Sequence, residues 1–386
     1  MRILHTSDWH LGRAFHGQGM LAHQAAFVDH LLAVVDAEQV DLVLVAGDVY
    51  DRALPPVDAV ALAEEALVRL ARSRARVVLT SGNHDSHQRL GFASRLIDAA
   101  GVHVRTHARD VGTPVLLEDE HGPVAVHGLP YLDPDHLREP WALPARSHEA
   151  AMAEALRRVR ADLDRRPGTR SVVMAHAFVA GAEPSDSERD IAVGGVQHVS
   201  PGLFDGFDYT ALGHLHGRHR LGPALCYSGS PLAYSFSEAT HRKGSWLVEL
   251  GPRGFVDAEF VDAPVPRPLA RLRGRLDDLL GDPRHHAAEQ SWAQVVLTDP
   301  TRPAQAKLRL ERRFPHLLSL GFEPEGPRTP QVPAARTGAG LTDHEIALEF
   351  VRDVRERPAA DAESALLRAA CDACRDDTDL DPGVVA

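Results

Sequence analysis

Cysteine, lysine and aromatic residues are scarce in this chain of 386 residues. The three cysteines, Cys226, Cys371 and Cys374, are too few for a disulfide framework, which favours a reducing compartment. Lysine occurs only at positions 243 and 307, so arginine carries nearly all of the positive charge, a bias that we attribute to codon usage. No segment approaches the roughly 20 apolar residues of a membrane span, and the N-terminus lacks the apolar run of a signal peptide. These absences predict a cytoplasmic protein that does not contact a membrane.

The overall charge is acidic, with a formal net charge of −12 and an isoelectric point of about 6.0. This balance argues against a surface coated for nucleic-acid binding, since such proteins usually carry a basic domain. A polyanion could still be held by bound metal ions, by a local arginine patch or by a partner chain. The length itself predicts two or three domains.

Strand and helix patterns alternate over the first two-thirds of the chain. Short apolar runs are typical of strands that are covered on both faces, whereas apolar residues three and four positions apart predict helices. The expected strands are residues 2–7, 41–46, 76–80, 102–105, 115–117, 124–127, 171–175, 209–212 and 246–250, the last of which closes the series. The expected helices are residues 24–38, 55–71 and 148–164. This alternation predicts an α/β fold.

A proline cluster at residues 263–268 predicts a domain boundary. We expect a large first domain, a small second domain, a linker and a helical tail, over residues 1–262, 263–323, 324–340 and 341–386. The second domain should contain two strands and one helix, at residues 269–275, 292–297 and 303–314.

The tail shows a capping-box pattern at Thr342 and Glu345, followed by one apolar stripe of Ile346, Phe350 and Val354. A second short helix is expected after residue 358. Two amphipathic helices on a tether are more typical of a docking segment than of a domain.

Five expected strands end on polar residues of metal-ligand type. In open α/β sheets ligands gather at the carboxyl ends of strands, so these distant positions should converge. The motifs are Asp8-Trp9-His10, Gly47-Asp48, Gly82-Asn83-His84-Asp85, His176 and Gly213-His214-Leu215-His216.

The donor types in these motifs suit a pair of divalent ions. Mixed carboxylate, amide and imidazole ligation fits Mn²⁺, Fe²⁺ or Zn²⁺, and the absence of thiolates argues against a structural zinc site. Two such ions usually share a carboxylate, activate a water and neutralise charge on a phosphoryl group, so the pattern predicts phosphoester hydrolysis. His84 could assist the leaving oxygen or orient the phosphate, and Asp85 could hold the other ring nitrogen of His84.

These motifs resemble the full signature of the calcineurin-like metallophosphoesterases. The resemblance is closest to the SbcD branch, the nuclease subunits of bacterial SbcCD complexes, in residues 1–12, 45–51 and 211–216 and in Gly229-Ser230-Pro231 followed by Ser235-Phe236. It covers roughly residues 1–250, and beyond them only the order of domains agrees. It implies a sandwich of mixed β-sheets flanked by helices, a small α+β capping domain and a helical C-terminal tail that docks on a partner.

The resemblance also implies a division of roles. Asp8, His10, Asp48 and His216 would hold one metal ion, while Asp48, Asn83, His176 and His214 would hold the other, with Asp48 bridging. His84 would be the catalytic histidine. Asp51 stands where archaeal and eukaryotic relatives have a histidine, although aspartate is ordinary in the bacterial branch. A second catalytic imidazole is therefore not expected, and we place Asp51 and Asp85 beside the ligands.

The implied activity is Mn²⁺-dependent cleavage of DNA in repair and recombination, exonucleolytic on duplex ends and endonucleolytic on single strands and hairpins. The implied partner is an SbcC-like coiled-coil ATPase that receives the tail helices. The implied assembly is a homodimer, through helices near residues 55–72 and 90–100, within a nucleoid-associated heterotetramer. Arg13, Arg52 and Arg89 adjoin the motifs and are candidates for contacts to DNA phosphates.

Two other functions stay open at this point. One is a phosphatase or phosphodiesterase for small substrates, which would need neither the second domain nor the tail. The other is a non-catalytic scaffold that kept the fold, which the loss of a ligand would support; no ligand position is missing.

Overall fold

The computed structural model describes residues 1–188, 198–325, 342–355 and 357–376. The chain forms two compact units, Met1–Glu323 and Pro324–Ala386. The expected linker lies outside the described residues from position 326 onward. Within the described residues, no helix is long and apolar enough to cross a bilayer.

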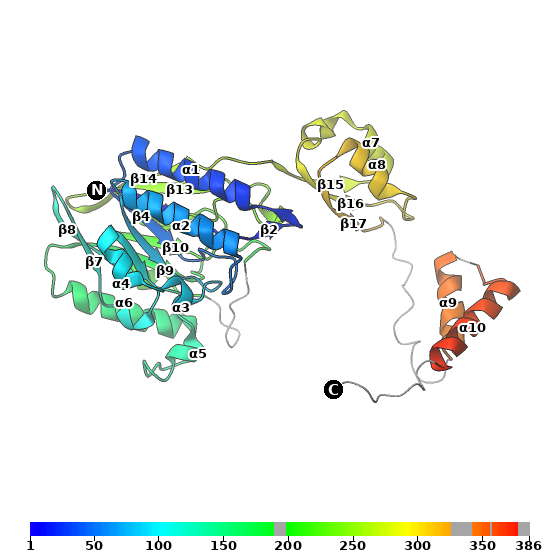
Figure 1. The fold of residues 1–386 in the computed structure, drawn as a ribbon, viewed down its shortest axis with the longest axis horizontal. Coiled ribbons are helices and arrows are strands. Elements are labelled where there is room, and N and C mark those ends of the chain that lie inside the picture. The colour runs from blue at the N-terminus through cyan, green and yellow to red at the C-terminus, as the bar shows by residue number, and fades with distance from the viewer. Residues whose placement is uncertain (189–197, 326–341, 356, 377–386) are drawn as a thin grey trace. The chain divides into compact units, whose positions relative to one another are not determined.

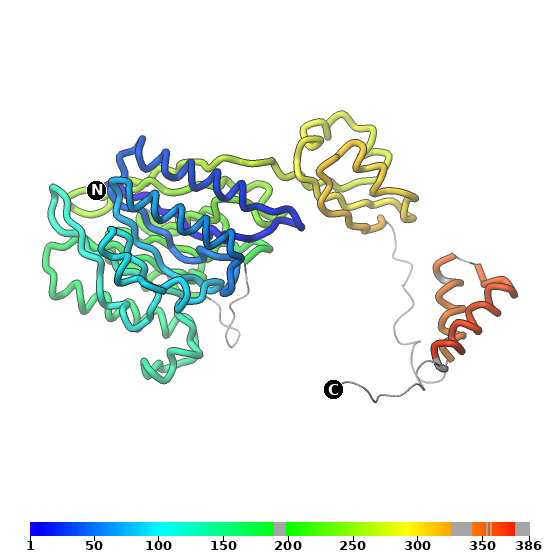
Figure 2. Tube along the Cα trace, in the orientation of Figure 1, coloured from blue at the N-terminus to red at the C-terminus, as the bar shows by residue number. Residues whose placement is uncertain are grey.

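The first unit is built on two mixed six-stranded sheets. One sheet has the order β14-β13-β1-β4-β5-β6, in which β1, β4, β5 and β6 run parallel. In this sheet β1 pairs with β13, which comes from far along the sequence. The trace in Figure 2 shows blue N-terminal segments and green to yellow-green segments together in one body. The strands of this sheet are β1 (Arg2–Thr6), β4 (Leu42–Ala46), β5 (Arg76–Thr80), β6 (Val102–Arg105), β13 (Gly244–Gly251) and β14 (Gly254–Asp262).

The other sheet has the order β11-β12-β10-β9-β8-β7. Its strands β8, β9, β10 and β12 are parallel to one another. The strands are β7 (Val115–Asp119), β8 (Gly122–Gly128), β9 (Arg170–His176), β10 (Tyr209–Gly213), β11 (His219–Gly222) and β12 (Leu225–Tyr227).

The two sheets face each other across a buried apolar layer. Ile3, Leu44 and Val78 from the first sheet lie in one buried cluster with Val172 and Met174 from the second. Because both faces of these central strands are covered, their sequences are nearly all apolar, as the short runs predicted.

Helices cover the outer faces of the sandwich (Figure 1). The apolar sides of α1 (Leu21–Ala37) and α2 (Val57–Arg72) pack on the first sheet, and α6 (His148–Leu163) packs on the second. Shorter elements fill the connections: the β2–β3 hairpin (Ala14–Phe15 and Gln18–Gly19), α3 (His87–Leu90), α4 (Ser94–Ile97) and α5 (Pro134–Leu137).

A three-stranded parallel sheet follows, with a small core of its own. Trp292 of this sheet packs against Phe15 of the β2–β3 hairpin, with ring centroids 5.4 Å apart. The elements are β15 (Leu269–Gly274), α7 (Leu276–Gly281), β16 (Trp292–Leu297), α8 (Ala306–Arg313) and β17 (Leu317–Phe322).

The second unit contains two helices that contact each other, α9 (Asp343–Arg355) and α10 (Asp361–Asp376). The expected capping box is present at the start of α9. Glu345 accepts hydrogen bonds from the backbone and hydroxyl of Thr342 at 2.7 and 2.8 Å, and the N–H of Glu345 donates to that hydroxyl at 3.3 Å.

The sequence-based prediction of an α/β sandwich is confirmed, but the expected series of strands was incomplete. The strand at 246–250 does not close the series, because β14 follows it and pairs with β13 at the edge of the sheet. Asp257, Glu259 and Asp262 of β14 are exposed. The predictions also omitted β11, β12, β17 and α7. The boundary expected at residue 263 stays a prediction, since the first compact unit runs on to Glu323.

Asp119 and Arg170 form a nearly buried ion pair far from the metal-ligand motifs. Arg170 donates to both carboxylate oxygens, at 3.0 and 2.5 Å, and also to the carbonyls of Gly122 and Gly251. The two side chains are only 6% and 8% exposed. Hydrogen bonding to Arg170 holds the pKa of Asp119 well below its usual range. The pair therefore ties the β7–β8 hairpin to β9 and β13.

We predict that Asp119→Asn lowers the free energy of unfolding at pH 7 by about 3 kcal/mol, because the arginine loses its buried partner. The depressed pKa means that this stability is present above the unfolded-state value near 3.8 and is lost as the pH falls below it. Chemical denaturation at several pH values should show the two proteins converging under acid conditions. The neighbouring exposed Glu118→Gln should change little at any pH; a pH-independent difference for Asp119→Asn would contradict this account.

Candidate metal centre

The polar strand ends converge at one edge of the sandwich. β1, β4 and β5 are neighbours in the first sheet, and β9 and β10 are neighbours in the second. All five run so that their carboxyl ends reach the same place, which brings together Asp8, His10, Asp48, Asn83, His84, His176, His214 and His216.

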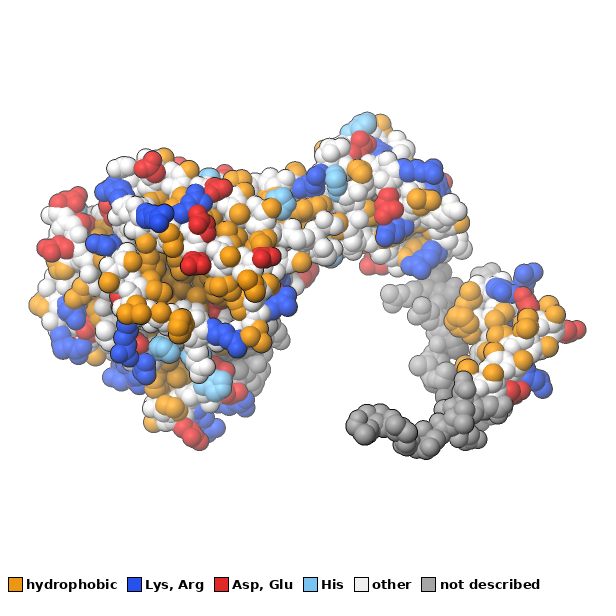
Figure 3. All heavy atoms as spheres, in the orientation of Figure 1, with side chains coloured by type: hydrophobic (Ala, Val, Ile, Leu, Met, Phe, Trp, Pro, Cys, Tyr) orange, Lys and Arg blue, Asp and Glu red, His pale blue; other side chains and the backbone are white. Residues whose placement is uncertain are grey.

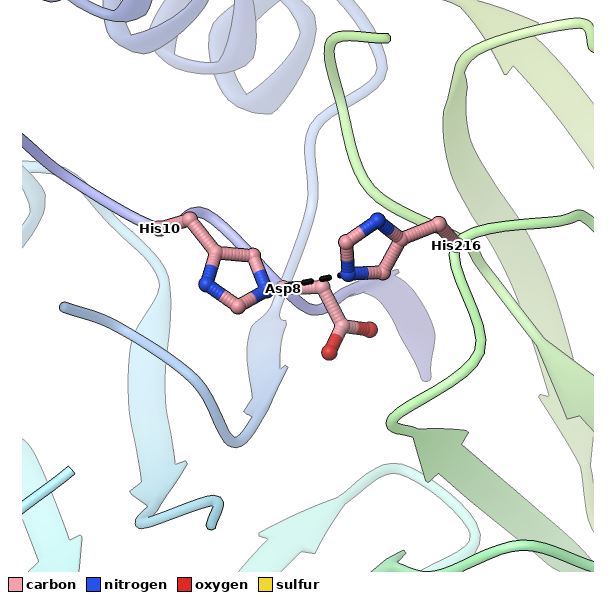
Figure 4. A group of neighbouring side chains, drawn as sticks. All are labelled: Asp8, His10 and His216. Carbon is pink, nitrogen blue, oxygen red and sulfur yellow. Dashed lines mark hydrogen bonds between the residues drawn. The ribbon is translucent and has the colours of Figure 1, made fainter. Parts of the chain in front are cut away.

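Asp8, His10 and His216 form the first group of candidate ligands. Their ligand atoms all lie within 4.8 Å of one another, and the three residues are buried. The two imidazole rings turn their Nε2 atoms toward each other at 3.0 Å, with the Asp8 side chain beside them (Figure 4). Only one of these two nitrogens can carry the proton between them, and both are close enough to ligate one ion once that proton leaves.

The second group centres on Asn83. Its Oδ1 lies 3.0 Å from Nε2 of His176 and 3.1 Å from Nδ1 of His214. Asp48 lies between the two groups, because its Oδ2 is 3.4 Å from Nε2 of His176 and 3.7 Å from Nε2 of His10. This position is the one that a bridging carboxylate requires.

Backbone groups orient the candidate ligands. Nδ1 of His176 donates to the carbonyl of Ala46 at 3.0 Å, which turns Nε2 toward the cluster. The other oxygen of Asp48 accepts from the N–H of His84 at 2.8 Å, and Asp8 accepts from the N–H of His214 at 3.1 Å. Such outer contacts fix the tautomer and direction of metal ligands.

Four of the candidate ligands adopt backbone conformations that non-glycine residues rarely occupy. The φ angles are 54° at Asp8, 45° at His10, 50° at Asp48 and 104° at His214. Each such residue costs on the order of 1–3 kcal/mol, and strain of this kind collects at functional sites. At these strand ends, the unusual backbone conformation lets neighbouring side chains, such as those of Asp8 and His10, both turn toward the ligand cluster.

Glycines make room for the ligands. A Cβ on Gly82 would lie 2.1 Å from Oδ1 of Asp48, and a Cβ on Gly47 would lie 2.3 Å from Nδ1 of His176. Gly47 also has a φ of +86°. Both positions of the sequence motifs thus require glycine for close approach.

Burial and neighbouring charges set the protonation of the donors. Burial lowers the pKa of His10 and of His214 well below the usual range, so both rings are neutral and carry an unprotonated nitrogen. Burial raises the pKa of Asp8 to about 6. Burial alone would lower the pKa of His176, but the carboxylate of Asp48 outweighs it and raises the value to about 9.

This donor set fits divalent cations. Neutral imidazoles, carboxylates and an amide oxygen are suitable ligands for Mn²⁺, Fe²⁺ and Zn²⁺. Nδ1 of His10 and Nδ2 of Asn83 are buried without a hydrogen-bond partner among the described residues. Hydrogen bonds within the cluster therefore do not satisfy all of its buried polar atoms. A buried set of this kind is expensive without compensating positive charge.

His84 lies beside the cluster, with its ring centroid 4.7 Å from that of His10. Its Nδ1 donates to the backbone carbonyl of Asp51 at 2.7 Å. The expectation that Asp85 holds this ring was therefore wrong. The carboxylate of Asp85 instead accepts from the N–H groups of Val49, Tyr50 and Gly82, and so fixes the two loops that carry Asp48 and Asn83.

The remaining predicted residues lie at the rim. Oδ1 of Asp51 is 3.7 Å from Nδ1 of His10 and 3.7 Å from Nε of Arg13. The guanidinium of Arg13 lies over the ring of Tyr234 and donates to the carbonyl of Ser187 at 2.8 Å. Arg52 is exposed on the loop after β4, and Arg89 is exposed on α3.

Sequence reasoning missed the buried polar residues behind His216. Ser187, Glu238 and Lys243 lie there and bond to one another and to His216. The rarity of lysine in the chain was the available signal, but we attributed it to codon usage. Ser187 comes from a loop whose position no local pattern indicates.

Two family models match this chain. Residues 1–218 match the model of the calcineurin-like phosphoesterases. The chain belongs to this family. Residues 265–355 match a second model, SbcD_C, described as the type 5 capsule protein repressor C-terminal domain. The two matches in this order support an SbcD-like phosphoesterase, and the family together with the ligand groups supports metal-dependent phosphoester hydrolysis.

Three solved structures show remote similarity to this chain. TT1561 of Thermus thermophilus is 14% identical and a novel archaeal phosphodiesterase is 11% identical, with TM-scores of 0.39 and 0.31. The matches cover 68% of this chain in both cases, and 98% and 100% of those chains. A β-glucosidase from Exiguobacterium marinum is 9% identical with a TM-score of 0.24, covering 83% of this chain and 89% of that chain. None of these similarities contributes to the assignment.

We predict that Gly82→Ala weakens Mn²⁺ binding by about tenfold or more, because the added methyl group displaces the carboxylate of Asp48. Isothermal titration calorimetry on protein shown to be folded by circular dichroism would measure this. Gly19→Ala is the matched control, since a Cβ there meets no atom within 4 Å. Equal Mn²⁺ affinity in Gly82→Ala and Gly19→Ala would refute the close-approach argument.

Proposed function

We propose that this chain is the nuclease subunit of an SbcCD-type complex, a Mn²⁺-dependent enzyme that hydrolyses DNA phosphodiesters. The observation that carries the proposal is the order of the two family matches, in which an SbcD_C segment follows a phosphoesterase domain. Duplex ends, single strands and hairpins would be its substrates. Its role would lie in DNA repair and recombination.

Two ions would divide the cluster between them. Asp8, His10 and His216 would bind one, and Asn83, His176 and His214 the other, with Asp48 shared. The contacts of Asp48 with His10 and His176 support this division. When bound, such a pair supplies an activated water and neutralises charge on the phosphoryl group.

His84 would serve the leaving group. Because Nδ1 already donates to the carbonyl of Asp51, a proton for the leaving oxygen would come from Nε2 of an imidazolium ring. The same ring could orient the phosphate by donating a hydrogen bond to it. In either role the carbonyl of Asp51 holds the ring in place, so Asp51 would act through its backbone.

The acidic net charge does not prevent DNA binding in this scheme. Two divalent ions would add local positive charge at the site, and Arg13, Arg52 and Arg89 lie around it. The guanidinium of Arg13 lies over the ring of Tyr234, pairs with Asp51 and donates to the carbonyl of Ser187. Its positive charge would therefore have a fixed position. Arg52 and Arg89 would contact phosphates farther along a strand.

The two alternatives receive less support. A scaffold without activity would be expected to have lost a ligand, whereas all seven candidate ligands are present and turned toward one another. A phosphodiesterase for small substrates would not account for the SbcD_C match or for the tail helices.

The tail would dock on the coiled-coil base of an SbcC-like ATPase. Phe350, Val354 and Leu366 are 67%, 65% and 72% exposed, and Ile346 is 36% exposed. Helices α9 and α10 thus carry an apolar surface that their mutual contact does not cover. Such a surface is suited to an amphipathic docking mode.

A second apolar surface would support a homodimer within the heterotetramer. Leu54, Val57, Val60, Phe92 and Leu96 are exposed on and beside α2 and α4, with exposures of 67%, 83%, 43%, 80% and 79%. Figure 3 shows hydrophobic side chains gathered on the face that carries these helices. Patches of this kind mark protein–protein contacts in soluble proteins.

We predict Mn²⁺-dependent cleavage of a hairpin DNA by the complex with an SbcC-type ATPase. His84→Ala should bind Mn²⁺ as the wild type does but cleave about 10²–10⁴-fold more slowly, because it lacks the acid. Gel assays and metal titrations would measure both properties. His87→Ala, a histidine in the next helix that lies outside the ligand cluster, is the control.

Hydrolysis of bis-p-nitrophenyl phosphate without any cleavage of DNA would favour the small-substrate alternative. Absence of both activities in Mn²⁺-loaded protein would favour the scaffold. Cleavage by His84→Ala at the wild-type rate would refute the role of His84 alone.

We predict that deletion of residues 341–386 abolishes capture of the SbcC-type ATPase while Mn²⁺ binding stays unchanged, since the tail belongs to the compact unit Pro324–Ala386 and the ligands belong to the other unit. Co-purification with the tagged ATPase would measure capture. The paired substitution Phe350→Ser and Val354→Ser should weaken capture in the full-length chain. Undiminished capture after the deletion would place the docking surface elsewhere.

A further inference from the structure

The two lysines of the chain lie in very different surroundings. Lys307 is 70% exposed and pairs with Glu311 one helical turn away. Lys243 is 7% exposed and lies behind the candidate metal centre. In a chain that uses arginine for nearly all of its positive charge, a buried lysine is a feature that codon usage does not explain.

Lys243 uses all three of its ammonium protons. Nζ donates to the backbone carbonyl of His216 at 2.8 Å, to the hydroxyl of Ser230 at 2.9 Å and to a carboxylate oxygen of Glu238. A compact ammonium group can direct three donors to three separate acceptors, whereas a planar guanidinium cannot adopt this geometry. Arginine would therefore not substitute for lysine here.

Glu238 connects this lysine to the ring of His216. Its side chain is fully buried. One oxygen accepts from Lys243, and the other lies 2.5 Å from the hydroxyl of Ser187 and 3.5 Å from Nδ1 of His216. The Ser187 hydroxyl lies 2.5 Å from the same Nδ1. The carboxylate thus reaches the outer nitrogen of His216 directly and through a hydroxyl.

The backbone of His216 is held from two sides. Its carbonyl accepts from Lys243 and from the N–H of Ser230 at 3.2 Å. Its N–H donates to Glu188 at 2.7 Å. Both backbone groups and the outer ring nitrogen are therefore engaged, and the remaining ring nitrogen, Nε2, points toward His10.

We propose that Lys243, Glu238 and Ser187 are positioning residues that fix the tautomer and direction of His216, and so set the affinity of one of the two metal ions. This proposal rests on the proposed dinuclear centre. Among the described hydrogen bonds, none joins Lys243, Glu238 or Ser187 to the ligands of the other ion. The affinity for that ion, which Asn83, His176 and His214 would hold, should therefore change little. Outer partners of this kind typically change metal affinity by about 10–100-fold.

The test is Mn²⁺ titration of the full chain by calorimetry, with electron paramagnetic resonance as a second readout. Lys243→Met should weaken one of the two sites about 10–100-fold and leave the other within about threefold. The spin-coupled signal of an ion pair should give way to that of a single Mn²⁺. Lys307→Met, which removes the only other lysine, should retain two sites.

Ser187→Ala is the second variant, because it breaks the link to the ring while leaving the Lys243–Glu238 pair intact. It should weaken the same single site about 10–100-fold, and its melting temperature without metal should stay close to that of the wild type. Two sites of wild-type affinity in both variants would overturn the proposal. Equal weakening of both sites together with a lower melting temperature in both variants would also overturn it, because the three residues would then only support the fold.

The result of the Mn²⁺ titrations does not depend on the result of the nuclease assay. Metal binding is measured without DNA, so a wild-type chain that binds two ions but cuts no DNA would contradict the proposed nuclease and leave the positioning role intact. A wild-type chain that binds fewer than two ions would overturn both.

Discussion

The structure depends on one electrostatic constraint: two carboxylates, an amide and four imidazoles are buried with their donor atoms turned toward one another. Burial holds His10 and His214 neutral. One ring nitrogen of each faces another candidate ligand atom, Nε2 of His216 for His10 and Oδ1 of Asn83 for His214. Such a group is stable only when positive charge lies within it. The left-handed backbone at Asp8 and Asp48, the glycine at position 82 and the carbonyl that holds His176 all serve this convergence. The strain that they introduce is distributed over several strand ends, each anchored in a sheet.

The sandwich explains how distant residues form one site. Each sheet delivers its own ligands from the carboxyl ends of neighbouring parallel strands, and Asp48 is placed where the two groups meet. Asp85 accepts hydrogen bonds from backbone N–H groups of the loops after β4 and β5. This carboxylate, which is not one of the candidate metal ligands, thereby sets the spacing between Asp48 and Asn83. On the far side, Lys243 and Glu238 do the same for His216. The site is thus surrounded by charged groups whose hydrogen bonds are largely buried and join segments remote in sequence.

Much of this was predictable from the sequence, because polar residues that end apolar runs are a local pattern. The bounds of β5, β6 and β16 were predicted to the residue, and the strand ends identified every candidate ligand. The partners of these ligands were not predictable, because they come from residues remote in sequence. Nothing local indicates that the carbonyl of Asp51, rather than Asp85, holds His84, or that Ser187 reaches His216. The left-handed φ angles were also hidden, since aspartate and histidine carry no sign of them. β14 was missed because its polar positions at a sheet edge resemble a loop.

The proposed dinuclear centre requires that two metal ions share Asp48. Anomalous diffraction from Mn²⁺-loaded crystals tests it most directly. We predict two anomalous peaks about 3.5–4 Å apart with the Asp48 carboxylate between them, one beside His10 and His216 and the other beside Asn83, His176 and His214. A single peak under saturating Mn²⁺, or two peaks that do not share Asp48, would contradict it.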